Sequence, residues 1–500
     1  MMNSGRHRAT SKWAISLGIL AAVSSCSAVL AIAQPAQDGA APADAAQNRA
    51  WCENRQRAFA PDLRIKGCTV IIDAANLTRS DLAVSYNNRG AAYQEKRDFD
   101  HALADYDEAI RLHPTYAPAF NNRGNVHQLK GDLDAAIVDY TDAIRFDFNF
   151  VQAFNNRGKA YQLKGDVDRA IADYNEALKL NPSFAMAFVN HGDASLAKGD
   201  LNRAIADYNE GIRLEPNSAT AFNNRGTAFG RRGDLDHALT DYDESIRLDP
   251  TYAAAFRNRG LTYQRKDNLD HALTDYNEAV RLDPKDPQNF NSRGNAKQEK
   301  DDLDGALVDF NEAIRINPKF APALRGRGGL REAMGDYDAA LVDFNEAIRV
   351  DPKDIDGYRA RGFANFYAAN YSAAISDLAR AVADKPTDAY PALWLYLARQ
   401  RVGDQTAAAE LATNARHLKP SDWPYAVVEM YLGERTPEAM LAAPAKPDER
   451  CEAQFYIGAW ELLRSDRAAA IESLKAAVST CPKNFVEFAD AKAELKRLGQ

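Results

Sequence analysis

The chain has no excess of positive charge, and this shortage excludes one class of protein. Its 500 residues contain 62 lysines and arginines against 70 aspartates and glutamates, a formal net charge of -8. A surface that binds nucleic acid needs the opposite balance, so no nucleic-acid partner is expected. Hydrophobic residues make up 46% and charged residues 26% of the chain. This composition excludes a disordered chain, a collagen and a polytopic membrane protein.

The sequence also lacks the short motifs that mark common catalytic sites. It contains no Walker A loop, no His-Glu-x-x-His, no nucleophile elbow and no paired Cys-x-x-Cys. Gly326-Arg327-Gly328-Gly329 resembles a phosphate loop, but it follows no strand and falls inside a predicted helix. His101, His237 and His271 lie in three separate repeats, so they are not expected to share a metal. We predict that the chain is not an enzyme and holds neither cofactor nor metal.

One long apolar run, Trp13 to Leu30, follows a basic N-terminus and precedes the small-x-small sequence Ala31-Ile32-Ala33. This pattern predicts a secretory signal peptide over residues 1–33, cleaved after Ala33. Two alternatives remain open. The run is long enough to stay uncleaved as a membrane span, and Val23-Ser24-Ser25-Cys26 resembles a lipobox in which Cys26 is lipidated. A membrane is therefore a partner only if the segment is retained or Cys26 carries lipid.

Cysteine is scarce, and its distribution agrees with export. Of five cysteines, one lies in the predicted signal, which leaves Cys52, Cys68, Cys451 and Cys481 in two clusters. Four cysteines allow three connectivities. In a reducing compartment all four would be buried thiols, whereas export favours two local disulfides. We predict the pairs Cys52 to Cys68 and Cys451 to Cys481, because antiparallel helices bring the start of one near the end of the other.

A 34-residue period organises the middle of the chain. Counting repeat positions 1–34 from residue 83, nine consecutive frames have Gly at position 8, Ala at position 20 and Asp at position 23. Position 24 is aromatic in eight of these frames. Proline recurs near the end of the frames, at Pro114, Pro182, Pro216, Pro250, Pro284, Pro318, Pro352, Pro386 and Pro420. Such a fixed period is the signature of an internal structural repeat.

The residue types at these positions predict a helical hairpin. Small residues at positions 8 and 20 let two antiparallel helices approach and bury the aromatic residues between neighbouring hairpins. A Gly-Asp turn separates the helices and the proline ends the second one. We expect the Asp at position 23 to play a structural role, opposite the Arg at position 7 of a neighbouring hairpin. Stacked hairpins form a solenoid with an extended concave surface.

This pattern resembles the tetratricopeptide repeat family, as in Asn155-Asn156-Arg157-Gly158 with Tyr161, Gly165-Asp166, Ala170, Tyr174, Ala177 and Pro182. The resemblance implies an all-α, right-handed superhelix of antiparallel helix pairs with capping hairpins. The predicted segments are a signal peptide (1–33), a flexible leader (34–50), an N-terminal capping half-repeat (51–82), nine repeats (83–388), a degenerate tenth repeat (389–422), an irregular insert (423–450) and a final hairpin with a closing helix (451–500).

The last 110 residues or so carry a narrower resemblance, to the NlpI-type tetratricopeptide lipoproteins of the bacterial envelope. The matching segments are Leu393-Trp394-Leu395-Tyr396-Leu397-Ala398, Val428-Glu429-Met430-Tyr431-Leu432-Gly433, Phe455-Tyr456-Ile457-Gly458 and Asn484-Phe485-Val486-Glu487. This resemblance implies a periplasmic adaptor, secreted through the inner membrane, that brings proteases or peptidoglycan-processing enzymes to their substrates. It also implies a homodimer.

A polar pattern on the first helix of each hairpin predicts the partner-binding groove. Position 6 is Asn in six successive repeats, and glutamines and later arginines accompany it: Asn88, Asn122, Asn156, Asn190, Asn224, Asn258, Gln128, Gln162, Gln264, Arg257, Arg325 and Arg359. Carboxamides donate and accept, as an extended peptide backbone requires. The pattern is similar to the asparagine ladder of O-GlcNAc transferases. Alternatively, the asparagines only satisfy contacts between helices.

The composition and the repeat together predict a scaffold that binds a protein or an extended peptide through its concave groove. The basic residues at position 5 would then receive an acidic partner segment. Two other functions remain open: an enzyme or enzyme subunit with a site in residues 421–450, where the period breaks, and a membrane-anchored or lipidated envelope assembly factor.

Overall fold

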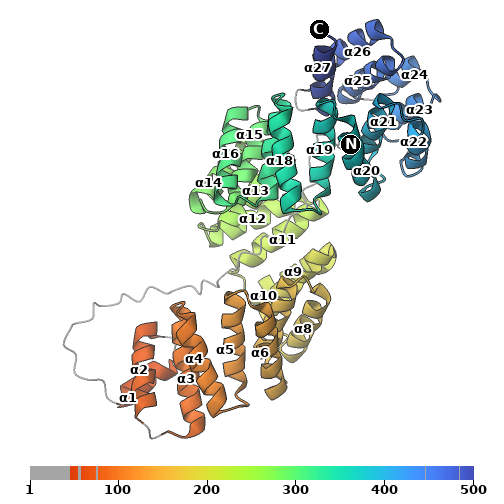
Figure 1. Cartoon of the computed structure of the whole chain (residues 1–500). Helices are drawn as coiled ribbons and strands as arrows, with labels where there is room; N and C mark the ends of the chain where they lie inside the picture. Colours follow the sequence, from red (N-terminus) through yellow and green to blue (C-terminus); the bar gives the residue numbers. More distant parts are fainter. Residues whose placement is uncertain (1–44, 55–57, 75–76, 445, 483–484) are drawn as a thin grey trace. The chain divides into compact units, whose positions relative to one another are not determined.

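The computed structural model describes residues 45–54, 58–74, 77–444, 446–482 and 485–500, and these residues form helices joined by short turns (Figure 1). No strand occurs in these ranges. The chain divides into two compact units, residues 45–250 and 251–500 of the described part. The predicted signal peptide, Cys26 and most of the predicted leader lie outside the described residues.

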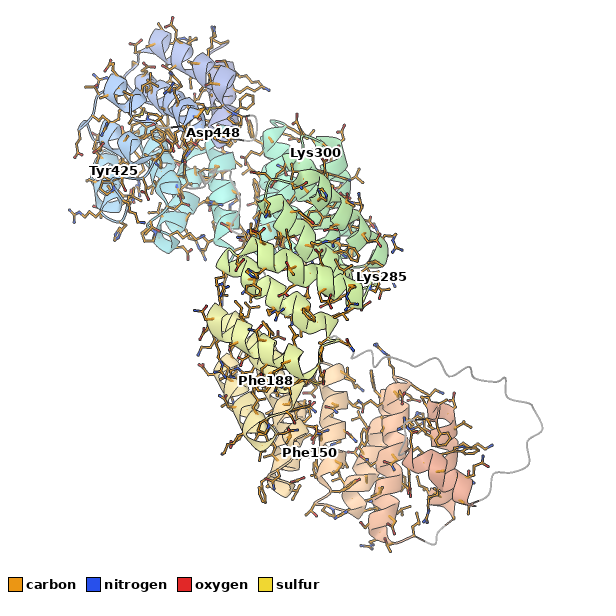
Figure 2. The ribbon with its side chains drawn as sticks, turned by 180° about the vertical axis from the view of Figure 1, so that it is seen from behind. Phe150, Phe188, Lys285, Lys300, Tyr425 and Asp448 are labelled. Atoms are coloured by element: carbon orange, nitrogen blue, oxygen red, sulfur yellow. A yellow bond between two sulfur atoms is a disulfide. The ribbon has the colours of Figure 1, made fainter. Side chains whose placement is uncertain are left out.

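The first unit consists of helices that pair in sequence order along the chain (Figure 1). Their bounds are α1 (Ala45–Glu53), α2 (Pro61–Asp73), α3 (Arg79–Glu95), α4 (Phe99–Leu112), α5 (Ala117–Leu129), α6 (Leu133–Phe146), α7 (Val151–Leu163), α8 (Val167–Leu180), α9 (Ala185–Lys198), α10 (Leu201–Leu214), α11 (Ala219–Arg232) and α12 (Leu235–Leu248). Figure 2 labels Phe150, the residue that precedes α7, and Phe188 of α9 in this unit.

The second unit continues the same pairing and ends in less regular helices. Its helices are α13 (Ala253–Arg265), α14 (Leu269–Leu282), α15 (Pro287–Glu299), α16 (Leu303–Ile316), α17 (Ala321–Ala333), α18 (Tyr337–Val350), α19 (Ile355–Tyr367), α20 (Tyr371–Asp384), α21 (Ala389–Arg401), α22 (Ala407–Ala415), α23 (Tyr425–Tyr431), α24 (Pro437–Leu441), α25 (Pro447–Leu463), α26 (Arg467–Thr480) and α27 (Val486–Arg497).

The predicted all-α fold of stacked hairpins is confirmed, and each predicted repeat contains one helix pair, from α3 and α4 to α19 and α20. Helix α1 begins at Ala45, so residues 45–50 form part of a helix rather than of the leader to which the sequence pattern assigned them. The region expected to be an irregular insert contains two short helices, α23 and α24.

The turn between the helices of a hairpin requires a left-handed residue at position 15. Gly131 has a φ of 85° there, and the carboxylate of the next residue, Asp132, accepts a hydrogen bond of 3.1 Å from the amide of Ala135. This bond caps the second helix at its N-terminus. Where position 15 is not glycine, as at Arg97 and Ala369, φ is still positive, 62° and 60°. The turn geometry is therefore imposed by the hairpin, and glycine only makes it less costly.

Glycine at position 8 makes room for the aromatic ring at position 24 of its own hairpin. A Cβ atom on Gly158 would lie 2.7 Å from a ring carbon of Tyr174, closer than atoms approach without strain. On its other side the Tyr174 ring packs with Ala194, which lies at position 10 of the next hairpin. The expected contact between positions 8 and 20 is thus only part of the packing, because the ring fills most of the space in front of the glycine.

Both predicted disulfides are present, one in each terminal region of the described chain. Cys52 of α1 and Cys68 of α2 are bonded with their Cα atoms 4.6 Å apart. Cys451 of α25 is bonded to Cys481, directly after α26, with Cα atoms 5.0 Å apart. Each bridge joins the two helices of a terminal hairpin.

The C-terminal hairpins share one large core around Trp394 of α21. Its indole ring stacks on Phe455 of α25 at 5.3 Å between centroids and meets the edges of Phe366 and Tyr367 of α19. The buried residues Val427 and Met440, from α23 and α24, belong to the same core. Residues 421–450 therefore help to seal the end of the solenoid. Figure 2 labels Tyr425 and Asp448 at the two sides of this segment.

Adjacent glycines in α17 test the packing at position 8. A Cβ atom on Gly328 would lie 2.6 Å from the ring of Phe344, whereas one on Gly329 would meet no atom within 4 Å. We expect Gly328→Ala to destabilise the second unit by about 1–3 kcal/mol through overpacking. Gly329→Ala should instead stabilise it by roughly 0.5–1 kcal/mol, because alanine is the better helix former. Urea unfolding followed by circular dichroism measures both, and equal effects from the two substitutions would refute the packing argument.

Candidate partner-binding face

An Arg–Asp ion pair joins the two helices of every regular hairpin. Arg157 Nε and Nη2 of α7 donate to the two carboxylate oxygens of Asp173 of α8 at 2.8 and 2.7 Å. The same bidentate pair, from position 7 to position 23, recurs at Arg89–Asp105, Arg123–Asp139, Arg225–Asp241, Arg259–Asp275, Arg293–Asp309, Arg327–Asp343 and Arg361–Asp377. The aspartates are buried. We call this pair the clamp.

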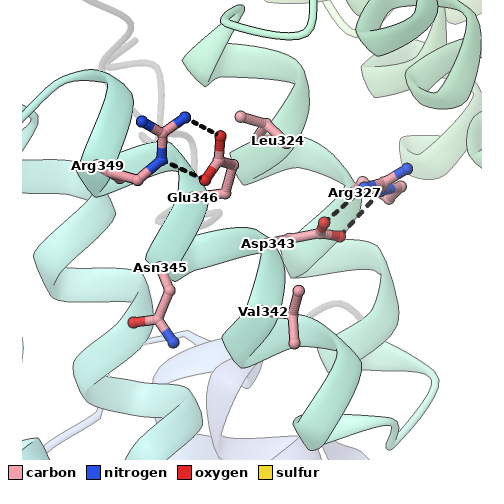
Figure 3. Close-up of a pocket in the computed structure, with 7 residues that line it drawn as sticks. All are labelled: Leu324, Arg327, Val342, Asp343, Asn345, Glu346 and Arg349. Atoms are coloured by element: carbon pink, nitrogen blue, oxygen red, sulfur yellow. Dashed lines mark hydrogen bonds and ion pairs between the residues drawn. The ribbon is translucent and has the colours of Figure 1, made fainter.

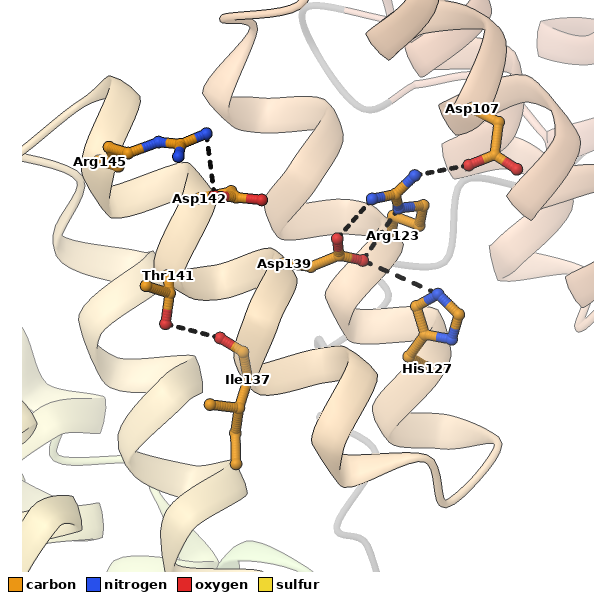
Figure 4. A network of polar contacts seen from close by, with 8 residues as sticks. All are labelled: Asp107, Arg123, His127, Ile137, Asp139, Thr141, Asp142 and Arg145. Atoms are coloured by element: carbon orange, nitrogen blue, oxygen red, sulfur yellow. Dashed lines mark hydrogen bonds and ion pairs between the residues drawn. The ribbon is translucent and has the colours of Figure 1, made fainter.

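The clamp also reaches the preceding hairpin through the remaining guanidinium nitrogen. Arg123 Nη1 donates to Asp107 at 2.6 Å while its other nitrogens hold Asp139, and His127 Nε2 lies 3.8 Å from the same Asp139 (Figure 4). The hydrogen bond with Asp139 raises the pKa of the Arg123 guanidinium above its ordinary value. The expectation that the aspartate faces an arginine of a neighbouring hairpin is therefore wrong. The ion pair lies within one hairpin, and the arginine alone crosses to the neighbour.

The fourth repeat replaces the arginine of the clamp with histidine. His191 Nδ1 lies 2.7 Å from an oxygen of Asp207, and Arg203 Nε donates to the same oxygen at 3.1 Å. The other ring nitrogen of His191 is buried and has no hydrogen-bond partner among the described residues. His191 thus still joins the two helices of its own hairpin, but it makes no hydrogen bond to the described residues of the preceding hairpin.

The asparagines at positions 5 and 6 form a continuous hydrogen-bonded row, which we call the asparagine ladder. Asn190 donates to Asn155 at 2.8 Å, Asn156 to Asn121 at 3.0 Å and Asn122 to Asn87 at 3.0 Å, each bond passing from one hairpin to the preceding one. Within a hairpin, Asn155 and Asn121 donate to their neighbours Asn156 and Asn122 at 3.4 Å. The donors of the bonds between hairpins all point toward the N-terminus. The position 5 members are buried, and those at position 6 are half-buried.

The ladder changes partner after the fourth repeat, because Val189 occupies position 5 there. Asn224 donates instead to Asp193 of α9 at 2.8 Å, and the hydroxyl of Tyr208 donates to the same oxygen at 2.8 Å. Lys159 lies 4.0 Å from the second carboxylate oxygen. Burial raises the pKa of Asp193. The position 9 residues Asn125 and Asp193 are thus part of the ladder, which the sequence analysis missed although both are polar residues one turn beyond the asparagines.

The glutamines predicted to line the groove accept hydrogen bonds from buried tyrosines. Tyr174 donates to Gln162 at 2.9 Å, and Tyr276 donates to Gln264 at 2.8 Å. Gln128 accepts a longer bond of 3.3 Å from Tyr140, whose hydroxyl also donates to Asn125. Burial raises the pKa of these tyrosine hydroxyls, so they remain protonated donors. Gln162 is buried, and the amide nitrogen of Gln264 donates to Glu299 at 2.7 Å, so these two glutamines are bonded within the chain.

The arginines at position 5 of the later repeats are already paired with carboxylates at the start of the following hairpin. Arg257 bonds to Asp286 at 2.6 Å, Arg325 bonds to Asp354, and Arg359 lies 3.5 Å from Asp388. Their charge is therefore balanced inside the chain. This pairing weakens the expectation that they attract an acidic partner segment.

A shallow depression of about 470 Å³ lies between α17 and α18 of the second unit, and its lining contains none of the position 5 and 6 residues (Figure 3). It is lined by Leu324, Arg327, Val342, Asp343, Asn345, Glu346 and Arg349. Its charged groups are already used, since Arg327 holds Asp343 and Arg349 holds Glu346. The nearby Gly326-Arg327-Gly328-Gly329 segment lies inside α17, as the repeat pattern predicts, and therefore forms no phosphate loop.

The three histidines at position 19 lie in the first turn of the second helix of their hairpins. His101 and His237 lie 2.8 Å from the capping residues Asp98 and Asp234, and His271 lies 2.9 Å from Asn268. In the described part of the chain, no group of three or more His, Cys, Asp or Glu residues is placed to hold a metal ion. No described helix is both long and apolar enough to cross a membrane.

Comparison with known proteins matches most of the repeat region to tetratricopeptide models. Models described as tetratricopeptide repeats match residues 83–116, 105–138, 151–184 and 253–286, and a TPR repeat model matches 129–165, 192–233, 229–267 and 330–367. Among solved structures, MamA is 27% identical over 32% of this chain and 95% of its own, with a TM-score of 0.30. A tetratricopeptide repeat protein from Parabacteroides merdae is 20% identical over 50% of this chain and 98% of its own, with a TM-score of 0.42.

Removing one partner of the clamp should strongly destabilise the first unit. Arg157→Ala leaves Asp173 buried without a cation, which typically costs about 3–5 kcal/mol. The double variant Arg157→Ala/Asp173→Ala removes the unpaired charge as well and should recover part of that loss. Lys179→Ala is the matched control, because Lys179 and Glu176 form an exposed pair on the same hairpin. The melting temperatures of the three variants, measured by circular dichroism, test this prediction. Equal melting temperatures for Arg157→Ala and the control would show that the clamp is dispensable for stability.

Proposed function

We propose that this chain, whose repeats match tetratricopeptide models, is a scaffold that binds proteins or peptides, and that the asparagine ladder of its first unit holds an extended partner segment. The observation that carries this proposal is the way the ladder is bonded. Asn122, Asn156 and Asn190 are half-buried, and each donates a hydrogen bond to an asparagine of the preceding hairpin.

The bonds between hairpins leave hydrogen-bonding capacity on the groove side. A carboxamide has two N–H donors and two acceptor lone pairs, and Asn122 and Asn190 each use a single donor in the ladder. At Asn122 and Asn190 the remaining donor and a lone pair are left for a ligand, whereas Asn156 also bonds to Asn125 at 3.1 Å. A peptide backbone presents both donors and acceptors, so the groove can bind it without selecting its side chains.

The same geometry supports a second role for the ladder, in holding the hairpins together. Replacing Asn156 would leave the buried oxygen of Asn121 without that donor, which costs stability as well as binding. Asn88 separates the two roles. It lies at position 6 of the first repeat, and no described residue hydrogen-bonds its side chain, so it contributes to the groove but not to the bonding between hairpins.

We propose further that the protein acts in the periplasm as a non-catalytic adaptor. The two disulfides support export, because structural disulfides persist in oxidising compartments. The signal-like residues 1–33 support it as well. From the NlpI-type resemblance we propose envelope proteases or peptidoglycan-processing enzymes as partners, with a homodimer as the working form. Mass spectrometry of the mature N-terminus distinguishes cleaved, lipidated and retained forms, and a cytosolic protein that retains Met1 and free thiols would contradict export.

Substitution of the ladder tests the binding proposal against a partner identified by crosslinking in envelope extract. Asn88→Ala should weaken capture by about two- to tenfold, the worth of one net hydrogen bond, without lowering the melting temperature. The triple variant Asn122→Ala/Asn156→Ala/Asn190→Ala should weaken it by about tenfold or more and also melt earlier. Asn175→Ala, at an exposed position on the second helix α8, is the control and should change neither quantity.

The comparison is made at a temperature where circular dichroism shows every variant to be folded. Full capture by the folded triple variant would reject the ladder as the binding surface. A loss of capture that appears only in variants that also melt earlier would assign the asparagines to structure alone.

A further inference from the structure

The closing helix α27 packs on α26 and α25 of the last hairpin, and its side chains bond to the C-terminal ends of α19 and α21. Arg497, at its C-terminal end, donates to the backbone carbonyl oxygens of Phe366 and Tyr367 in the last turn of α19. Arg401 of α21 bonds to Glu494 of α27 at 2.7 Å. First helices are the elements that carry the asparagine ladder in the first unit. In the second unit, two of the corresponding helices are thus contacted at their C-terminal ends by a segment of the chain itself.

The face of α27 that meets these helices is acidic and buried. Glu487, Asp490 and Glu494 are spaced three and four residues apart, which places them on one side of a helix. Their exposed fractions are 4%, 1% and 2%. Glu452 of α25 faces the same cluster and is 3% exposed. Burying an ionised carboxylate is costly unless a cation or several donors compensate it.

Of these four carboxyls, Glu494 is the one that forms ion pairs with the nearby arginines. Glu494 bonds to both Arg401 and Arg497, at 2.7 and 2.6 Å. Glu487 accepts a hydrogen bond of 2.9 Å from the hydroxyl of Tyr456, a neutral donor. Asp490 has a buried oxygen, Oδ1, with no hydrogen-bond partner among the described residues.

Glu452 is also surrounded by neutral donors. Its Oε2 accepts hydrogen bonds from the Tyr390 hydroxyl at 2.9 Å and the Trp423 indole nitrogen at 2.8 Å. The other ionisable groups around the cluster on α17, α18, α19, α20, α21, α23 and α25 are tyrosines and carboxyls: Glu332, Tyr337, Tyr367, Tyr371, Tyr396, Tyr431 and Glu449. On α26, the cations Arg467 and Lys475 bond to Leu498 and Gln500 beyond the end of α27. Glu449 is paired with Lys446. The two arginines are therefore outnumbered by carboxyls.

Burial shifts the titration of three of these groups in the same direction. It raises the pKa of Glu452 to about 8, and it also raises the pKa of Glu487 and of Asp490. The seated helix therefore holds protons that an exposed carboxyl releases above pH 4 to 5. Since the seated state binds more protons, its stability is fully present below that range and is lost as the pH rises through the raised values.

We propose that α27 is a proton-controlled latch, seated against α19, α21 and α25 while the carboxyls of Glu452, Glu487 and Asp490 are neutral, and released when they ionise. The released state frees the Phe366 and Tyr367 carbonyl oxygens and the aromatic surface beside them. The part of α19 and α21 that α27 contacts is then uncovered at neutral or alkaline pH and covered in mildly acidic surroundings. This inference concerns the second unit and does not depend on the ladder of the first.

Hydrogen–deuterium exchange of the full chain tests the latch between pH 5 and pH 9, with rates corrected for intrinsic exchange. The protection of the α27 amides in the unmodified protein should fall by about tenfold or more across this range, while that of α8 in the first unit stays constant. In the variant Glu452→Gln/Glu487→Gln/Asp490→Asn these three side chains cannot ionise, so the protection of α27 should depend much less on pH than in the unmodified protein. Glu472→Gln, at an exposed position on α26, is the matched control and should behave as the unmodified protein.

Protection of α27 that does not change with pH in the unmodified protein would overturn the proposal. The same slope in the triple variant as in the unmodified protein would overturn it too. If the triple variant fails to fold, Asp490→Asn alone provides the test. It must reduce the pH dependence while circular dichroism remains that of the unmodified protein, and an undiminished dependence counts against the latch.

Discussion

The bidentate ion pair between positions 7 and 23 is the constraint on which the repeat architecture depends. Two nitrogens of the arginine donate to both oxygens of the buried aspartate, as Arg123 does with Asp139. The third nitrogen bonds to the preceding hairpin, as Arg123 does with Asp107. A buried carboxylate tolerates few geometries, so the pair sets how the two helices of a hairpin face each other. Glycine at position 8 then becomes necessary, because the aromatic ring at position 24 is held against the first helix.

These contacts occupy one side of each first helix and leave its other side available for binding. The clamp and the aromatic ring hold the hairpin from within, and the carboxamides at positions 5 and 6 follow on the groove side. In the first unit these carboxamides bond mostly to one another, from Asn190 back to Asn87. In the second unit arginines at position 5 bond to aspartates instead, and toward its end α27 bonds to the C-terminal ends of α19 and α21. The two units therefore offer different surfaces built on one repeat.

Periodicity was enough to predict the hairpins and their order, because each depends on spacing within a local segment. Both disulfides followed from that spacing together with the signal-like N-terminus, which indicates an oxidising compartment. The partner of the aspartate at position 23 could not be predicted from spacing, since Asp105 lies 16 residues after Arg89 and 18 before Arg123, and both arginines are in adjacent helices. The internal bonding of the ladder also depends on side-chain directions that a one-letter pattern does not contain. The buried acids Glu487 and Asp490 would be assigned to a solvated face by composition, and only the packing of α27 places them inside.

The central claim is that partners bind on the face formed by the first helices, and site-specific photocrosslinking measures this most directly. A benzoylphenylalanine is placed at Gln152, an exposed residue of α7 one turn before the ladder asparagines, or at Lys179, an exposed residue of the second helix α8. The account predicts that irradiation in envelope extract links a protein partner from position 152 and not from position 179. Linkage from 179 with none from 152 would contradict it.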